Sequence, residues 1–211
     1  VAAIGLRRGL EAVIIGAMVI APLLGPNRAL ALATTLGDIA LAKRALRANL
    51  AGVGVALVSA LVAALVWPGD PTVDAIAARI APAPSDVALA LASGVAGALA
   101  FTSGLPSSLV GVMVAVALLP PLVVMVMMAT LGRWDAAVGA GLLLSINVVC
   151  VNLAAVGTFL LLGVRPRTWW EADRSRKATR IALTFWVCLL ALLAALLVAA
   201  QGGFSRVLGE H

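Results

Sequence analysis

The sequence predicts an all-α protein, a polytopic bundle of transmembrane helices, and three observations support this prediction. Of its 211 residues, 63% are hydrophobic and 11% are charged, with a mean hydropathy of +1.13. These values are typical of integral membrane proteins. The apolar runs are continuous and approach the ~20 residues that a spanning helix needs. The strands of a β-barrel would instead alternate apolar and polar residues. The third observation is an internal repeat, because residues 1–37 resemble residues 96–132.

The two copies share twelve identical residues over 37 ungapped positions, where composition alone gives about four or five. Each copy has an apolar run, a proline-containing break, a second apolar run and a Thr-Leu-Gly stop. The breaks fall at residues 23–26 (LLGP) and 118–121 (LLPP). Broken hydrophobic segments at corresponding positions are typical of transporters built from repeated units.

The first copy covers residues 1–67. Residues 1–6 read as the end of a helix whose start is missing, so we expect a fragment of a longer protein. The broken segment 12–37 follows, then a basic link at 38–47 and a clean span at 48–67. This order predicts a truncated helix, a broken helix and a full helix.

A polar loop, residues 68–86, separates the copies, and its apolar residues recur at helical spacing, which predicts a short interfacial helix. The second copy, 87–162, repeats the pattern, so residues 1–162 form a duplicated core. A basic cytoplasmic loop (163–180), an extra C-terminal span (181–201) and a tail (202–211) complete the chain.

The orientation of the copies depends on whether the broken segments cross the membrane. Three crossings per copy make the repeat inverted, which we favour, whereas re-entrant hairpins would make the copies parallel. With three crossings, one side carries three Lys or Arg in 38–47 and six in 165–180, against five on the other side. The nine-charge side is predicted to be cytoplasmic. This placement also explains the net charge of +6 without nucleic acid as a partner.

The two breaks supply candidate solute-binding residues. Proline lacks an N–H, so it leaves carbonyl groups unpaired, and the following half-helix points a positive N-terminus at the break. A structural kink is the plain alternative. Arg28, deep in an apolar run, either binds an anion there or extends its guanidinium to the membrane surface. The candidates are Gly25, Pro26, Asn27, Arg28, Pro120 and Pro121.

Two asparagines, Asn147 and Asn152, lie in the long span after the second break. They either link helices by hydrogen bonds or line a polar pathway. Asp38 is expected to cap a helix or to pair with Lys43 or Arg44. The sequence lacks a membrane-depth group of His, Glu or Asp and any HExxH pattern, so no enzyme, metal or cofactor is predicted.

Several motifs in order resemble a known family. They are AVIIGAMVIAPLLGP (12–26), LGD (36–38), SGLP (103–106), VALLPPL (116–122) and NVVCVNLAA (147–155). The chain up to residue 166 is similar to the bacterial "uncharacterised hydrophobic domain" membrane proteins (domain of unknown function 389). The resemblance implies a multi-pass protein of the bacterial inner membrane, without an established activity. In the family's pattern positions 27 and 28 are apolar, so Asn27 and Arg28 depart from it.

The leading functional prediction is a transporter or channel for a small solute, possibly an anion, bound between the two broken helices. The alternative is a membrane scaffold or sensor whose basic loop docks a partner or anionic lipid. Small residues along the helices favour a homo-oligomer within the lipid bilayer.

Overall fold

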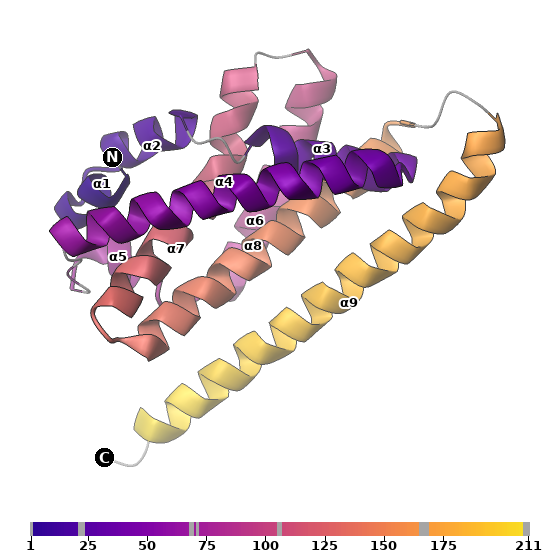
Figure 1. Ribbon diagram of the computed structural model, residues 1–211. Coiled ribbons are helices and arrows are strands. Elements are labelled where there is room, and N and C mark those ends of the chain that lie inside the picture. The colour runs from indigo at the N-terminus through magenta and orange to yellow at the C-terminus, as the bar shows by residue number, and fades with distance from the viewer. Residues whose placement is uncertain are drawn as a thin grey trace.

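The computed structural model describes residues 2–20, 24–67, 70, 72–104, 107–164 and 169–208, which form helices and no strand. This confirms the all-α prediction (Figure 1). In chain order the helices are α1 (Ala2–Arg8), α2 (Glu11–Ile20), α3 (Leu24–Leu36), α4 (Ile39–Val66), α5 (Asp74–Ala77), α6 (Pro84–Thr102), α7 (Ser107–Thr130), α8 (Trp134–Leu161) and α9 (Trp169–Leu208).

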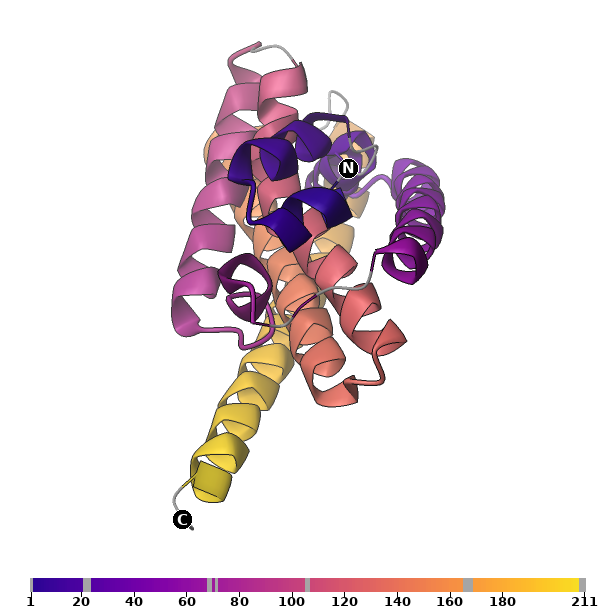
Figure 2. The ribbon, with the colours of Figure 1, turned by 90° about the vertical axis from the view of Figure 1, so that its left-hand side faces the viewer.

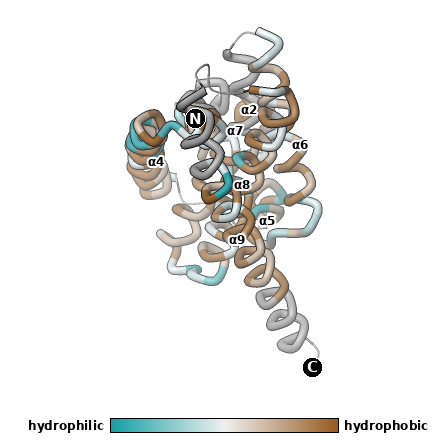
Figure 3. The backbone as a smooth tube through the Cα atoms, turned by 90° about the vertical axis from the view of Figure 1, so that its right-hand side faces the viewer, coloured by the Kyte–Doolittle hydropathy of each residue, from teal (hydrophilic) through white to brown (hydrophobic). Residues whose placement is uncertain are grey.

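Four described helical stretches are long and apolar enough to cross a membrane: α4, α6, α8 and the part of α9 from Thr179 to Val198. Brown hydrophobic residues line most of the helices in Figure 3, and hydrophilic residues gather toward helix ends and connections. Together with the composition, these stretches identify a helical membrane protein.

Helix α8 forms the centre of the bundle. In its most apolar stretch 61% of the residues are buried, against 17% in α4 and 6% in the apolar part of α9. Helices α3, α6, α7 and α9 all pack against α8. Helix α4 stands to one side and α9 extends beyond its neighbours (Figure 2). The apolar outer faces of α4 and α9 therefore suit contact with lipid.

The chain alternates between two ends of the bundle. At one end Thr179 of α9 donates a hydrogen bond to the carbonyls of Thr34 (3.0 Å) and Thr35 (3.1 Å) at the end of α3. The starts of α4 and α9, which carry the basic segments, therefore lie at this end (Figure 1). At the opposite end α1 shares a small pocket with Trp67, the residue after α4.

Both break-containing segments connect the two ends. Helix α2 follows α1 at the Trp67 end, and α3 finishes at the Thr179 end. Helix α7 leads from the end of α6, where Phe101 packs edge-on to Phe159 of α8, to the start of α8. The segments thus run through the bundle rather than turning back. Their equivalence as copies of one repeat remains a prediction.

The first predicted break falls between α2 and α3, and residues 21–23 lie outside the described residues. Pro26 occupies the first turn of α3, where backbone N–H groups have no helical partner, so it does not disturb the helix. The prediction of a second break was wrong, because α7 continues through Pro120 and Pro121. The reason is a side chain from α8, described in the next section.

Both basic segments are more helical than predicted. Helix α4 begins at Ile39, and Asp38 caps it by accepting a hydrogen bond from the Leu41 N–H (2.9 Å), which confirms the capping prediction. Helix α9 already begins at Trp169, within the predicted basic loop, and continues to Leu208. Residues 169–180 contain no Gly or Pro, so nothing in their backbone chemistry stops a helix. The short helix predicted between the copies is α5, and its Ile76 is fully buried in the core.

Candidate solute-binding site

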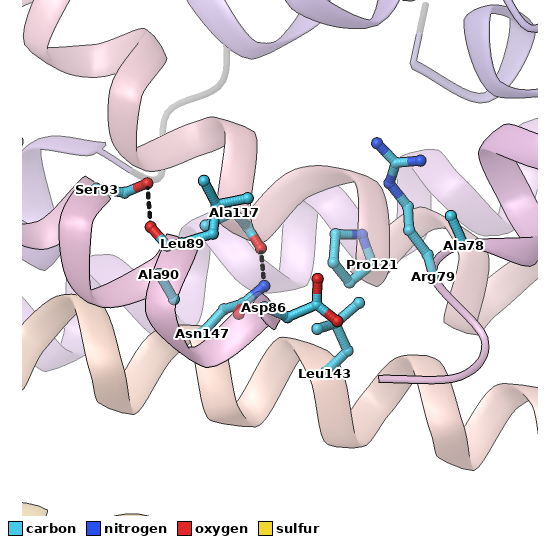
Figure 4. A pocket seen from close by; sticks show the side chains of 10 residues that line it. All are labelled: Ala78, Arg79, Asp86, Leu89, Ala90, Ser93, Ala117, Pro121, Leu143 and Asn147. Carbon is cyan, nitrogen blue, oxygen red and sulfur yellow. Dashed lines mark hydrogen bonds between the residues drawn. The ribbon is translucent and has the colours of Figure 1, made fainter. Parts of the chain in front are cut away.

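The continuity of α7 depends on Asn147 of α8. Pro121 has no N–H, so the Ala117 carbonyl one turn earlier has lost its helical partner. The Asn147 Nδ2 donates to that carbonyl at 2.7 Å, as the dashed line in Figure 4 shows. A side chain thus replaces the missing backbone donor. This leaves the proline pair inside a continuous helix.

Ala117, Pro121 and Asn147 form one wall of a cavity of about 180 Å³. Four elements enclose it: the turn after α5, the first half of α6, and the middles of α7 and α8. Its size suits a solute of a few non-hydrogen atoms or a small group of waters. The lining residues are Ala78, Arg79, Asp86, Leu89, Ala90, Ser93, Ala117, Pro121, Leu143 and Asn147 (Figure 4).

Asn147, which lines this cavity, carries an unsatisfied acceptor. The residue is 5% exposed, and its Oδ1 is buried without a hydrogen-bond partner among the described residues. Its orientation is fixed, because only Nδ2 can donate to the Ala117 carbonyl. A buried polar atom without a partner costs about 1–3 kcal/mol, so such an atom beside a cavity indicates a ligand or water.

The other polar groups come from α6 and the turn before it. The Asp86 carboxylate accepts a hydrogen bond from the Ala83 N–H at 2.8 Å, in the first turn of α6. The Ser93 hydroxyl donates to the Leu89 carbonyl at 2.8 Å. The Arg79 guanidinium donates to the Ala75 carbonyl, and in Figure 4 it points away from Asp86.

A second polar contact lies further along α8. The Asn152 Nδ2 donates to the Asn27 Oδ1 of α3 and to the Val148 carbonyl, both at 2.8 Å. Its own Oδ1 is buried without a partner in the described part of the chain. The neighbouring space is only about 10 Å³, roughly the size that one water needs. This pair therefore joins α3 to α8 with almost no empty space beside it.

The depth of the two contacts follows from their places in α8. Asn147 is in the middle of this 28-residue helix, which is about 42 Å long. Asn152 is about 7.5 Å nearer the Thr179 end. Asp86 lies in the first turn of α6, toward the Trp67 end. The cavity thus leads from that end to the middle of the bundle, where the pair of Asn27 and Asn152 follows.

The structure brings the predicted residues together in two pairs. Pro121 and Asn147 both line the cavity, and Asn27 accepts a hydrogen bond from Asn152. Pro120 is buried beside Pro121, and Gly25 and Pro26 lie with Asn27 in the first turns of α3. Arg28 belongs to α3, but its side chain lies outside the described part of the structure, so its role as an anion ligand stays a prediction.

Sequence reasoning missed three polar residues of the cavity. Arg79, Asp86 and Ser93 line it. They were not predicted because all three precede the second predicted break by more than twenty residues. Asp86 carried one usable signal, since it is a carboxylate at the start of an apolar span. No group of three metal-ligating side chains occurs among the described residues.

The fold and the cavity define a helical membrane protein with a polar site at mid-depth. The chain belongs to the family described as "Domain of unknown function (DUF389)", which it matches over residues 18–153. It is also 34% identical over 198 residues to an uncharacterized protein of Methanocaldococcus jannaschii. That match covers 94% of this chain and 62% of the relative, so the chain spans less than two thirds of its length. No solved structure matches the chain significantly.

The family match confirms the resemblance carried by the sequence motifs. The relative belongs to an archaeon, so the similarity is not limited to bacterial proteins.

Proposed function

We propose that the protein is a transporter or channel for a small polar solute in the cytoplasmic membrane of a prokaryote. The observation that carries the proposal is the cavity at Asn147, which brings an unsatisfied polar atom to the middle of an apolar bundle. A buried polar group within a membrane segment is costly, and it commonly marks a substrate pathway.

The hydrogen-bonded pair of Asn27 and Asn152 suits a role in transport. A transporter keeps its site open to one side at a time, and the asparagine pair joins α3 to α8 between the cavity and the Thr179 end. Opening toward the Thr179 end requires the contact between α3 and α8 to separate.

Transport fits the cavity better than catalysis. Ser93 is the only hydroxyl among the described lining residues, and it donates to a backbone carbonyl rather than to a base. A serine nucleophile needs a neighbouring base to accept its proton. The scaffold alternative requires no cavity, so it leaves the buried Asn147 oxygen unexplained.

Flux measurements on the full chain in liposomes test the proposal. Ser93→Leu places a larger apolar side chain in the cavity, and we expect it to abolish a saturable flux of small ions or neutral solutes. Ala92→Leu is the matched control, because Ala92 is the preceding residue of α6 and is exposed. Equal flux in the two variants would place transport elsewhere. Arg28→Ala, tested in parallel, reports on the predicted anion site.

A further inference from the structure

We propose that the cavity selects a small solute that donates hydrogen bonds, of the ammonium or primary amine class. This inference rests on the proposed function, and it names the chemical class of the solute. We infer this class from the hydrogen bonds that the polar groups lining the cavity already make.

The walls offer acceptors. Asn147 uses its donor on the Ala117 carbonyl and leaves Oδ1 without a partner in the described structure. Ser93 uses its proton on the Leu89 carbonyl, so its oxygen has only lone pairs left. The Asp86 carboxylate accepts from the Ala83 N–H and keeps further lone pairs.

Arg79 is the one charged donor among the described residues that line the cavity. Arg79 follows α5, and its guanidinium donates to the Ala75 carbonyl. Asp86 carries the opposite charge in the first turn of α6, and the guanidinium points away from it (Figure 4). An anion would meet the acceptor atoms of Asn147, Ser93 and Asp86, which repel it. A protonated amine would satisfy the same atoms with its N–H groups.

Size gives a second constraint. The cavity holds about 180 Å³, and the separate space beside Asn152 holds only about 10 Å³. A solute that reaches Asn147 must therefore be compact. The innermost polar residue that lines the cavity is Asn147 in the middle of α8, while the carboxylate of Asp86 lies nearer the Trp67 end. A cation is therefore attracted first by the Asp86 carboxylate and is then held farther in, near Asn147, through its N–H groups.

Methylammonium and tetramethylammonium separate this inference from simple charge selection. The two cations carry the same charge, but only methylammonium has N–H donors. Binding of labelled methylammonium to the full chain in nanodiscs is measured first, followed by uptake into proteoliposomes corrected with protein-free vesicles. We expect saturable binding that tetramethylammonium does not displace.

Two substitutions locate the binding. Asp86→Asn keeps an oxygen for the Ala83 N–H but removes the charge, so methylammonium affinity should fall about tenfold or more. Asp135→Asn is the control, because Asp135 is an exposed carboxylate in the first turn of α8 and does not line the cavity. Ser93→Leu should remove binding by occupying the space. Equal affinity in all three variants would overturn the assignment to this cavity.

The outcomes distinguish the solute class from transport itself. Saturable binding without uptake would support the donor class and contradict transport. Saturable nitrate or acetate flux that Ser93→Leu removes and methylammonium does not inhibit would support transport and overturn the donor class. Absence of binding and of flux for every probe, in correctly folded protein, would contradict both.

Discussion

The Asn147 amide combines a structural and a functional role in one side chain. Its Nδ2 repairs the hydrogen bonding of α7 at Pro121, and its Oδ1 faces the bundle without a partner in the described residues. Asn147→Ala should therefore lower the free energy of unfolding by about 1–3 kcal/mol, because the Ala117 carbonyl becomes a buried group without a partner.

A double-mutant cycle tests this explanation. Pro121→Ala restores an N–H that can bond to the Ala117 carbonyl within α7. The cost of Asn147→Ala should then become smaller in the Pro121→Ala background than in the wild type. Denaturation in mixed micelles measures both costs. Ser145→Ala is the control, since the Ser145 hydroxyl donates within its own helix, to the Gly141 carbonyl. An unchanged cost of Asn147→Ala would contradict the repair of α7.

At the scale of the element, the contact between α6 and α8 holds the cavity together. A Cβ added to Gly94 would lie 2.6 Å from the Val151 carbonyl oxygen and 2.8 Å from the Ala154 Cβ. Backbone cannot yield as a flexible side chain can, so α6 and α8 would have to separate. Gly94→Ala should destabilise the protein by about 1–3 kcal/mol.

Gly157→Ala is the matched control for Gly94→Ala. Gly157 also lies within a spanning helix, but an added Cβ would meet nothing within 4 Å. Alanine favours helix by up to ~1 kcal/mol over glycine, so this change should leave the thermal midpoint equal or raised. Similar losses in both variants, measured by thermal unfolding in detergent, would show that glycine itself matters rather than the helix contact.

The elements also show what a sequence can predict. The apolar runs gave the positions of the spanning helices, because length and hydropathy are properties of the segment itself. The fate of Pro120 and Pro121 was not predictable, since the amide that keeps α7 continuous comes from 30 residues away in another helix. The grouping of Asp86 and Ser93 with Asn147 likewise depends on how α6 and α8 cross.

At the scale of the whole molecule, the predicted orientation requires the two basic segments to lie at the same end of the bundle. The sequence assigns nine basic residues to segments 38–47 and 165–180 and predicts that these segments face the cytoplasm. In the structure Thr179 bonds to the end of α3, immediately before Asp38, so the starts of α4 and α9 lie at one end. This end is predicted to be cytoplasmic, and the cavity would then lead from the opposite side.

Single-cysteine labelling in intact cells tests that orientation. In a background without Cys150 and Cys188, cysteines are placed at Lys43, Thr72 and Arg133, which are all exposed. A membrane-impermeant maleimide should label the last two positions, which follow α4 and α7 at the Trp67 end, but label Lys43 only after the membrane is opened. Labelling of Lys43 alone would reverse the orientation, so that the cavity would lead from the cytoplasm. Labelling of all three would contradict the separation of the two ends by a membrane, and with it the alternation of α4, α6, α7 and α8.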